Sequence, residues 1–421
     1  MGSGITRRDA LKLTGLALGG IAVANSLPGC GSKTSESADK SDPGNTNSLM
    51  SGLDPYYPGK EKLAADEMRI TLLGTSPIPR RSQQCNSIFV ETGSGDQFIF
   101  DCGSGTIANY NAMGIQISRM NKVLLTHLHG DHMSDLTHIY CFGPSADRKS
   151  PLYVWGPARS NVPDPITGVV YDDGTRAFCG NFREMCRWHT ESFSFGATSY
   201  ASYQPPTRES WGLPVDPVPV SKDAPNEAYA VVPIELDWTK NGSTPGDNIA
   251  YNNPATGVKI THFPVIHARK GSIGYKLEWN GLSMIFTGDT KPSSEVVRQA
   301  SGVTVLFHEM VVPAEIWAMK NMHITSKDQV SPEVWTAAYN YALAVQNSSH
   351  TPQGAFGYLL SQMKPAPKLA VATHFQATDD TIDSAMKSIR EHYPKGDVTI
   401  AADLMVLNVK PSGITKRRAV V

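Results

Sequence analysis

The chain lacks an excess of charge of either sign. Its 421 residues contain 38 Lys and Arg against 39 Asp and Glu, which gives a formal net charge of −1 at pH 7. A protein that binds nucleic acid by electrostatic attraction normally carries a clear basic excess. We therefore expect no nucleic-acid partner for this chain.

Long apolar runs and internal repeats are also missing. After the first thirty residues, no apolar stretch reaches the roughly 20 residues that a membrane-spanning helix needs. The sequence contains no solenoid-type repeat. The composition, 40% hydrophobic and 18% charged, is that of an ordinary globular protein, long enough for one large domain or two small ones.

The first part of the chain has the character of a targeting segment. Arg7 and Arg8 precede an apolar run rich in Gly and Ala, which is similar to a twin-arginine export signal over 1–29. Cys30 follows Leu-Pro-Gly, similar to a lipoprotein processing site, and the polar residues after it indicate a flexible tether over 30–66. These features predict an exported protein, periplasmic or at the cell surface, whose only membrane contact is a lipid anchor at Cys30.

Cysteine is scarce, with six residues in the chain. If Cys30 carries a lipid, five cysteines remain, and this odd number predicts at least one free thiol. Disulfides can form in an exported protein. Cys179 and Cys186 are close enough in sequence to bridge, although sequence does not establish their pairing.

The stretch from Thr126 to His132 is dense in metal-ligand side chains. It follows an apolar run that predicts a buried strand, and it precedes a predicted helix. Neutral imidazoles and carboxylates are the usual ligands of zinc and similar ions. His127 and His129 point the same way because they are two positions apart on an extended segment. Asp131 and His132 follow a glycine bend and can face a second ion.

Two series of short β-rich runs, each followed by helical segments, predict an α/β fold with two sheets sandwiched between helices. The second series ends with Val398–Val409, which we expect to close a sheet. Between the two series, residues 160–250 are rich in Pro, Gly and Ser and contain six Lys or Arg against twelve Asp or Glu. We expect this acidic segment to be an insertion packed over the domain, with a helix over Thr175–Trp188.

Further short motifs occur on both sides of the histidine stretch. They are Leu73-Gly74-Thr75-Ser76-Pro77, Phe100-Asp101-Cys102-Gly103, Gly156-Pro157, His267 with Gly274-Tyr275, Gly288-Asp289-Thr290, His308-Glu309, His350-Thr351 and Thr373-His374-Phe375. Together they resemble the metallo-β-lactamase superfamily, and in particular its ribonuclease Z branch, which also contains phosphodiesterases and metal-dependent arylsulfatases. The resemblance implies an αββα sandwich over 67–412, with the insertion at about 160–250.

The resemblance also implies two zinc ions held by seven side chains. These are His127, His129 and His267 for one ion, Asp131, His132 and His374 for the other, and Asp289 bridging both. The residues support this assignment independently, because several of them follow predicted strands whose ends converge on one edge of a sandwich. Two ions about 3.5–4 Å apart can activate a water molecule and stabilise the charge that develops on an ester. His262 competes with His267, but only His267 has Gly-Tyr at the family's spacing.

Three catalytic side chains are implied by the same resemblance: Asp131, His350 and Glu309. His350 matches the branch's additional histidine, which can protonate the leaving group or stabilise an oxygen of the transferred group. Glu309 would orient His350. Asp101 is expected to orient a ligand histidine. The alternatives are a turn carboxylate for Asp101 and a water-facing residue at a helix start for His350.

Two segments depart from the ribonuclease Z pattern. The segment from His308 to His350 is longer than expected and contains Trp317, Trp335 and Tyr339, which could form a lid with an apolar wall for an aryl group or an extra helix packed on the core. The insertion after Pro157 lacks a basic glycine-rich arm that would grip tRNA. Ribonuclease activity is therefore disfavoured at this stage.

These observations lead to an exported dinuclear zinc hydrolase that acts on small phosphodiesters or sulfate esters, as a phosphodiesterase or arylsulfatase does. The alternative within the superfamily is a lactonase or β-lactamase type of hydrolase, which the His350 motif does not favour. A third hypothesis is a non-catalytic, surface-anchored binding protein. The complete set of ligand positions argues against it.

Overall fold

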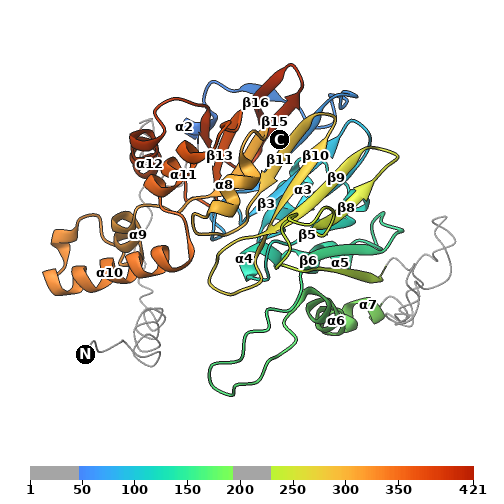
Figure 1. The fold of residues 1–421 in the computed structure, drawn as a ribbon, viewed down its shortest axis with the longest axis horizontal. Helices are drawn as coiled ribbons and strands as arrows, with labels where there is room; N and C mark the ends of the chain where they lie inside the picture. The colour runs from blue at the N-terminus through green and yellow to red at the C-terminus, as the bar shows by residue number, and fades with distance from the viewer. Residues whose placement is uncertain (1–46, 193–228) are drawn as a thin grey trace, which may run out of the picture. The chain divides into compact units, whose positions relative to one another are not determined.

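A computed structural model of the chain describes residues 47–192 and 229–421, and Figure 1 shows their fold. The predicted export signal, Cys30 and the tether as far as residue 46 lie outside the described residues. None of the helices in the described ranges has both the length and the apolar character that a bilayer crossing requires.

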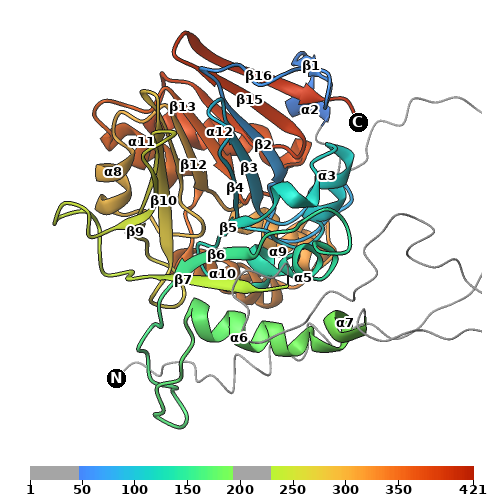
Figure 2. The same cartoon turned by 90° about the vertical axis from the view of Figure 1, so that its right-hand side faces the viewer.

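Two β-sheets form the centre of the fold, as Figures 1 and 2 show from two sides. Among the described residues, the larger sheet has nine strands in the order β1-β16-β15-β2-β3-β4-β5-β6-β7, and the smaller has seven in the order β14-β13-β12-β11-β10-β9-β8. The larger sheet contains β1 (Asp54–Tyr56), β2 (Met68–Gly74), β3 (Ser87–Thr92), β4 (Gln97–Phe100), β5 (Lys122–Leu124), β6 (Leu152–Pro157), β7 (Val231–Leu236), β15 (Met405–Lys410) and β16 (Gly413–Ala419). The smaller contains β8 (Ile249–Asn253), β9 (Val258–Pro264), β10 (Ile273–Trp279), β11 (Leu282–Phe286), β12 (Val305–Glu309), β13 (Leu369–Thr373) and β14 (Val398–Ile400).

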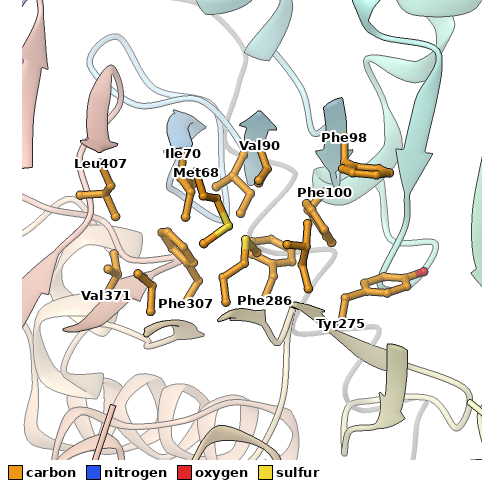
Figure 3. Close-up of a cluster of buried hydrophobic side chains, with 14 of the residues drawn as sticks. Met68, Ile70, Val90, Phe98, Phe100, Tyr275, Phe286, Phe307, Val371 and Leu407 are labelled. Carbon is orange, nitrogen blue, oxygen red and sulfur yellow. The ribbon is translucent and has the colours of Figure 1, made fainter. Parts of the chain in front are cut away.

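The main hydrophobic core lies between the two sheets. Successive side chains of a strand point to opposite faces, so each buried strand serves two clusters. In β3, Ile88 and Val90 belong to the cluster between the sheets, whereas Phe89 belongs to the cluster under the helices. Figure 3 shows side chains of the larger sheet, such as Ile70, meeting Phe307 of the smaller one. Burial of this apolar surface from water is the main force that holds the sheets together.

Helices cover the outer face of each sheet. The larger sheet carries α3 (Thr106–Ala112), α5 (Leu136–Phe142) and α6 (Thr175–Met185), which is followed by α7 (Arg187–Ser192). The smaller sheet carries α8 (Ser294–Ala300), α11 (Gln353–Gln362) and α12 (Asp379–His392). The layers are therefore helix, sheet, sheet and helix, which confirms the predicted αββα sandwich.

A helical hairpin extends beside α11 and α12 (Figure 1). It consists of α9 (Ala314–Asn321) and α10 (Pro332–Ser349), which is the segment that the sequence marks as longer than expected. Ser331 caps α10 by accepting a hydrogen bond from the Val334 amide, and a proline occupies the first turn, as is favourable at helix starts. The two helices pack through a separate small cluster built around Ala314, Ala318 and Ala342.

The domain is longer at both ends than the predicted 67–412. Residues of the expected tether form α2 (Asn47–Met50) and β1, and β1 pairs in parallel with β16 beyond the predicted end. Tyr56 is buried, and it accepts a hydrogen bond from Arg69 over 3.0 Å. The prediction of a flexible tether over 30–66 is therefore wrong for its described part, which forms α2 and β1. The segment is polar overall, and its composition does not show that Tyr56 is buried.

Two further expectations are changed by the structure. Val398–Val409 does not form one strand: β14 belongs to the smaller sheet and β15 to the larger, with Ala401 and Ala402 buried between the two sheets. The segment 160–250 contains the predicted helix, but it also supplies β7 and β8, which are edge strands of the two sheets. The described parts of this segment, residues 160–192 and 229–250, therefore contribute to the sandwich itself and are not only a cover.

The five cysteines in the described residues are buried and free. No disulfide joins Cys179 to Cys186 in this part of the chain. The expectation of at least one free thiol agrees with this arrangement.

Candidate metal centre

The predicted ligands converge at one edge of the sandwich. The strands β11, β12 and β13 are parallel neighbours, so their carboxyl ends lie at the same edge. Asp289 follows β11, Glu309 ends β12 and His374 follows β13. The histidine stretch follows β5 of the other sheet, and the Tyr275 hydroxyl donates to the Leu125 carbonyl over 2.8 Å. Both sheets therefore contribute to one site.

The first ligand group consists of His127, His129 and His267. The His129 Nδ1 and His267 Nε2 atoms are 3.2 Å apart, and the His127 ring lies within 4.8 Å of both neighbouring rings, measured between centroids. His127 is 5% exposed, whereas His129 is exposed to solvent. Burial lowers the pKa of His267 to about 4 and that of His127 well below its usual range. The group therefore presents neutral imidazoles, the form that binds metals.

The second ligand group consists of Asp131, His132 and His374. The Asp131 Oδ2 atom lies 3.1 Å from His374 Nε2 and 3.4 Å from His132 Nε2. His132 is fully buried on the short helix α4 (Gly130–Met133), which begins directly after the extended part of the stretch. Burial alone would raise the pKa of the Asp131 carboxyl, but the neighbouring His132 and His374 outweigh burial and lower it.

Asp289 joins the two groups through its two carboxylate oxygens. Its Oδ1 faces the second group, at 3.2 Å from His132 Nε2 and 3.3 Å from His374 Nε2. Its Oδ2 faces the first group, at 3.7 Å from His267 Nε2. The side chain is 2% exposed. This division of the two oxygens is the geometry expected of a carboxylate shared by two cations.

Neighbouring acceptors fix the orientation of the histidines. His132 Nδ1 donates to Asp101 Oδ2 over 2.7 Å, and Asp101 also accepts from the Thr126 amide and hydroxyl, each over 2.8 Å. His267 Nδ1 donates to the Ser349 carbonyl over 2.9 Å. In both histidines this leaves Nε2 directed at the centre, which is the usual arrangement of a metal-binding histidine.

The backbone is bent sharply around the site. Gly288 has φ 59°, and a Cβ there would lie 2.4 Å from the Thr126 hydroxyl oxygen, so only glycine fits before Asp289. Asp101 and His374 also have positive φ values, 55° and 57°. Such conformations are uncommon for residues other than glycine and cluster at functional sites.

The residues at this edge fit metal ions. One atom from each of His127, His129, His267 and Asp289 lies within 4.8 Å of the others, and the same holds for Asp131, His132, Asp289 and His374. Within the described residues, His127 Nε2, His132 Nε2 and Asp289 Oδ1 are buried without a hydrogen-bond partner, which is costly unless another group satisfies them. Burial would lower the pKa of His132, but Asp289 and Asp101 raise it well above its usual range. The site therefore favours positive charge.

His350 and Glu309 form a pair beside these groups. His350 Nδ1 lies 2.9 and 3.0 Å from the two Glu309 oxygens, so it donates to the carboxylate and leaves Nε2 free. The His350 ring stacks on His374 with 5.6 Å between centroids. Glu309 is fully buried and accepts from the Thr290 amide. Burial raises the pKa of Glu309 and lowers that of His350.

Two cavities flank the centre. The charged cavity, of about 180 Å³, is lined by the first ligand group and by Arg269, Lys270 and Asp173, of which Arg269 and Asp173 form an ion pair. The apolar cavity, of about 320 Å³, is lined by His350 and His374 together with Ile78, Val311, Val312, Trp317 and Val345. Trp317 was expected near the site from the sequence, whereas the charged cavity was not, although Arg269 and Lys270 follow His267 closely.

The structure brings together His127, His129, Asp131, His132, His267, Asp289, His350, Glu309 and His374 at one site. His262, the rival of His267, is buried on β9 and is absent from the described groups of potential ligands. Asp101, for which an orienting group and a turn carboxylate were the two expectations, contacts His132 directly.

Residues 80–140 match the family model described as the metallo-beta-lactamase superfamily. This range contains the whole histidine stretch. The match supports a metallo-β-lactamase superfamily assignment. Members of this family are metal-binding hydrolases, so the finding agrees with the ligand geometry at the sheet edge.

Similar curated proteins carry the name ribonuclease Z. One from Mycolicibacterium gilvum is 27% identical over 254 residues, which cover 58% of this chain and 69% of the relative. Another from Methanothermobacter thermautotrophicus is 24% identical over 355 residues, which cover 82% of this chain and 97% of the relative. Among solved structures, the short form of human tRNase Z has a TM-score of 0.47 at 18% identity and covers 80% of this chain and 98% of its own.

These relatives contradict one expectation. The prediction that nucleic acid is not a partner is wrong, because relatives spanning most of the domain are named as ribonucleases. The prediction rested on the net charge of the whole chain, and net charge says little about the charge beside a site. Arg269 and Lys270, which line the charged cavity, show how basic side chains can gather locally in a near-neutral protein.

Proposed function

We propose that the chain is a hydrolase of phosphodiester bonds whose active site holds two divalent ions. The observation that carries the proposal is the position of Asp289, whose two oxygens face the two ligand groups separately. When bound, two such ions lower the pKa of water and stabilise the charge on the oxygens of a phosphodiester. The imidazole and carboxylate ligands suit zinc, which we propose as the metal.

Side chains around the centre have distinct parts in this proposal. Asp131 has a side chain that is 25% exposed, against 2% for Asp289, so it is the ligand carboxylate that a proton from water can reach. The hydrogen bond from His350 Nδ1 to Glu309 leaves Nε2 available to protonate the oxygen of the leaving group. Glu309 holds the His350 ring in place through its hydrogen bond with Nδ1.

Phosphodiesters are the first choice of substrate because the similar curated proteins are named ribonuclease Z. RNA is therefore among the candidate substrates, together with smaller diesters. Sulfate esters are the second choice, since their hydrolysis requires the same stabilisation of anionic oxygens and the same protonated leaving group. The pair of His350 and Glu309 supports both over lactone or β-lactam hydrolysis, because each of these esters loses an oxygen leaving group that His350 can protonate.

The test is a substrate screen with the metal-loaded protein. We expect hydrolysis of bis-p-nitrophenyl phosphate or of an oligoribonucleotide, lost after treatment with a chelator and restored by Zn²⁺. An Asp289→Ala variant, compared with a surface control such as Asp397→Ala, should be inactive. Hydrolysis of a lactone or a β-lactam alone, or activity unaffected by the chelator, would contradict the proposal. p-Nitrophenyl sulfate in the same screen tests the second choice.

We also propose export in the folded state and anchoring through Cys30. The support is the sequence of residues 1–30, with paired arginines, an apolar run and a cysteine after it. A folded metalloprotein is suited to this route because its ions can be loaded before transport. Fractionation of a Cys30→Ala variant tests the anchor. We expect it to leave the membrane fraction, and a variant that stays there as the parent does would exclude lipidation as the anchor.

A further inference from the structure

The apolar cavity next to His350 points to a site for the leaving group of the ester. We infer that it binds an uncharged aryl group attached to the oxygen that leaves. This inference rests on the proposed hydrolysis and adds the chemical class of one half of the substrate.

The position of the cavity supports this assignment. His350 and His374 line it, and they also border the metal centre, so a molecule held at the centre can extend into it. His350 is the side chain that we propose protonates the leaving oxygen. A group bonded to that oxygen must therefore lie on the His350 side of the centre, which is the side of this cavity.

The lining of the cavity selects for an uncharged ring. Val311, Val312, Val345, Ile78 and the half-buried Trp317 supply apolar surface, and Asn321, Gln346 and Gln376 add uncharged amides. Among the described lining residues the two histidines are the only ionisable ones. A cavity of about 150 Å³ with apolar walls is enough for a benzene molecule. The observed 320 Å³ therefore accommodates one aryl ring and a small substituent.

The wall is held in place before a ligand arrives. The Gln346 side-chain amide donates to the Val312 carbonyl over 2.6 Å, and the Val311 amide donates to the Thr351 carbonyl over 3.0 Å. On the hairpin, Trp317 stacks on Tyr341 with 5.9 Å between ring centroids. A preformed apolar wall lowers the entropic cost of binding a rigid ring.

The experiment compares two phosphonates, phenylphosphonate and methylphosphonate, which share the anionic group and differ in the ring. Their binding to the zinc-loaded protein is measured by calorimetry. Full burial of an aromatic ring predicts that phenylphosphonate binds about 10- to 100-fold more tightly than methylphosphonate. In Trp317→Ala this ratio should fall by about tenfold, mainly through weaker binding of phenylphosphonate.

A matched control uses the other tryptophan of the hairpin. Trp335 stacks on Tyr339 and is not among the residues that line the cavity, so Trp335→Ala should keep the parent ratio. Ile78→Ala gives a second test outside the hairpin, because Ile78 is 51% exposed and its loss leaves the core intact. We expect it to lower the ratio about threefold.

Binding and hydrolysis separate the two proposals. A parent protein that hydrolyses the diester but binds both phosphonates equally would overturn the aryl site and leave the proposed function standing. A ratio that is unchanged in both Trp317→Ala and Ile78→Ala would overturn it as well. Selective binding of phenylphosphonate without any hydrolysis would overturn the proposed function while the cavity retains its preference.

Discussion

The two ligand groups differ in charge and in what lies beside them. The first group has three imidazoles and borders the charged cavity, where Arg269 and Lys270 are found. The second has two imidazoles and the carboxylate of Asp131, and its His374 borders the apolar cavity. With Asp289 shared, one carboxylate faces an ion in the first group, whereas two carboxylates face an ion in the second.

Because its two sides differ, one shared centre can bind a substrate in a single orientation. Carboxylate charge raises the affinity of a site for a cation, so the second group should bind its ion more tightly. An ester at the centre has a charged cavity on one side and an apolar cavity with His350 on the other. Under the proposed function, the two cavities would distinguish the two ends of the substrate before any bond breaks.

The largest effect is expected for the residue that the two groups share. Asp289→Ala should lose both ions, because its removal takes a carboxylate from each group and leaves the mutual repulsion of the cations uncompensated. Elemental analysis should find little metal after dialysis, and hydrolysis should fall to the level of the metal-free protein. Asp397→Ala, which alters a surface ion pair with Lys416, is the control and should keep both ions. Full metal content in Asp289→Ala would remove Asp289 from the centre.

Substitutions within one group should remove one ion. His129→Ala is expected to retain about one ion per chain, held by the more acidic second group. His374→Ala should weaken the tighter ion, so this variant should retain less metal than His129→Ala at the same concentration of a competing chelator. If His129→Ala loses more metal than His374→Ala, the order of affinities proposed for the two groups is wrong.

His350→Ala should keep both ions but hydrolyse its substrate more slowly. If His350 protonates the leaving group, kcat should fall by about 10²- to 10⁴-fold for poor leaving groups such as alkyl or unactivated phenyl esters. p-Nitrophenyl esters should suffer much less, because their leaving group needs little protonation. A uniform fall across leaving groups would indicate stabilisation of an oxyanion or positioning of the substrate. Loss of metal would make His350 a ligand.

The smallest effect is expected from a residue that acts through a ligand. Asp101→Asn should lower the affinity of the second group for its ion by about 10- to 100-fold, because Asp101 fixes the His132 ring through Nδ1. Asp101 does not contact the histidine rings of the first group directly, so the affinity of that group for its ion should change less. Competition titrations with a chromophoric chelator measure the affinity of each ligand group for its ion. An equal loss of affinity in both ligand groups would show that Asp101 supports the whole stretch from Thr126 to His132 and not His132 alone.

The fold was largely predictable from local patterns, and the histidine stretch stands out for the same reason, whereas the full set of candidate ligands came from the family resemblance. Buried strands such as β2 are continuous apolar runs, and His127 and His129 are two positions apart after such a strand. Val398–Val409 shows where local patterns fail. One apolar run divides between two sheets at a turn where Leu404 has φ 67°, and hydrophobicity alone does not show which sheet a strand joins.

The cavities were less predictable because they depend on contacts between distant segments. Ile78, Val312 and Trp317 come from separate parts of the chain and meet only after the hairpin docks beside His350. The positive charge beside the site was not predictable for the same reason. The near-neutral sequence led to a wrong expectation about nucleic acid, while the positions of Arg269 and Lys270 become evident only in the folded protein.

The most direct test of the central claim is a titration of metal-free protein with Zn²⁺, in which bound metal and hydrolysis of bis-p-nitrophenyl phosphate are followed together. We expect two ions to bind in sequence, the first to the second ligand group, and activity to rise with the second equivalent. In Asp289→Ala neither step should occur. Full activity with one equivalent in the parent, or the same two-step titration in Asp289→Ala, would contradict a centre built on one shared carboxylate.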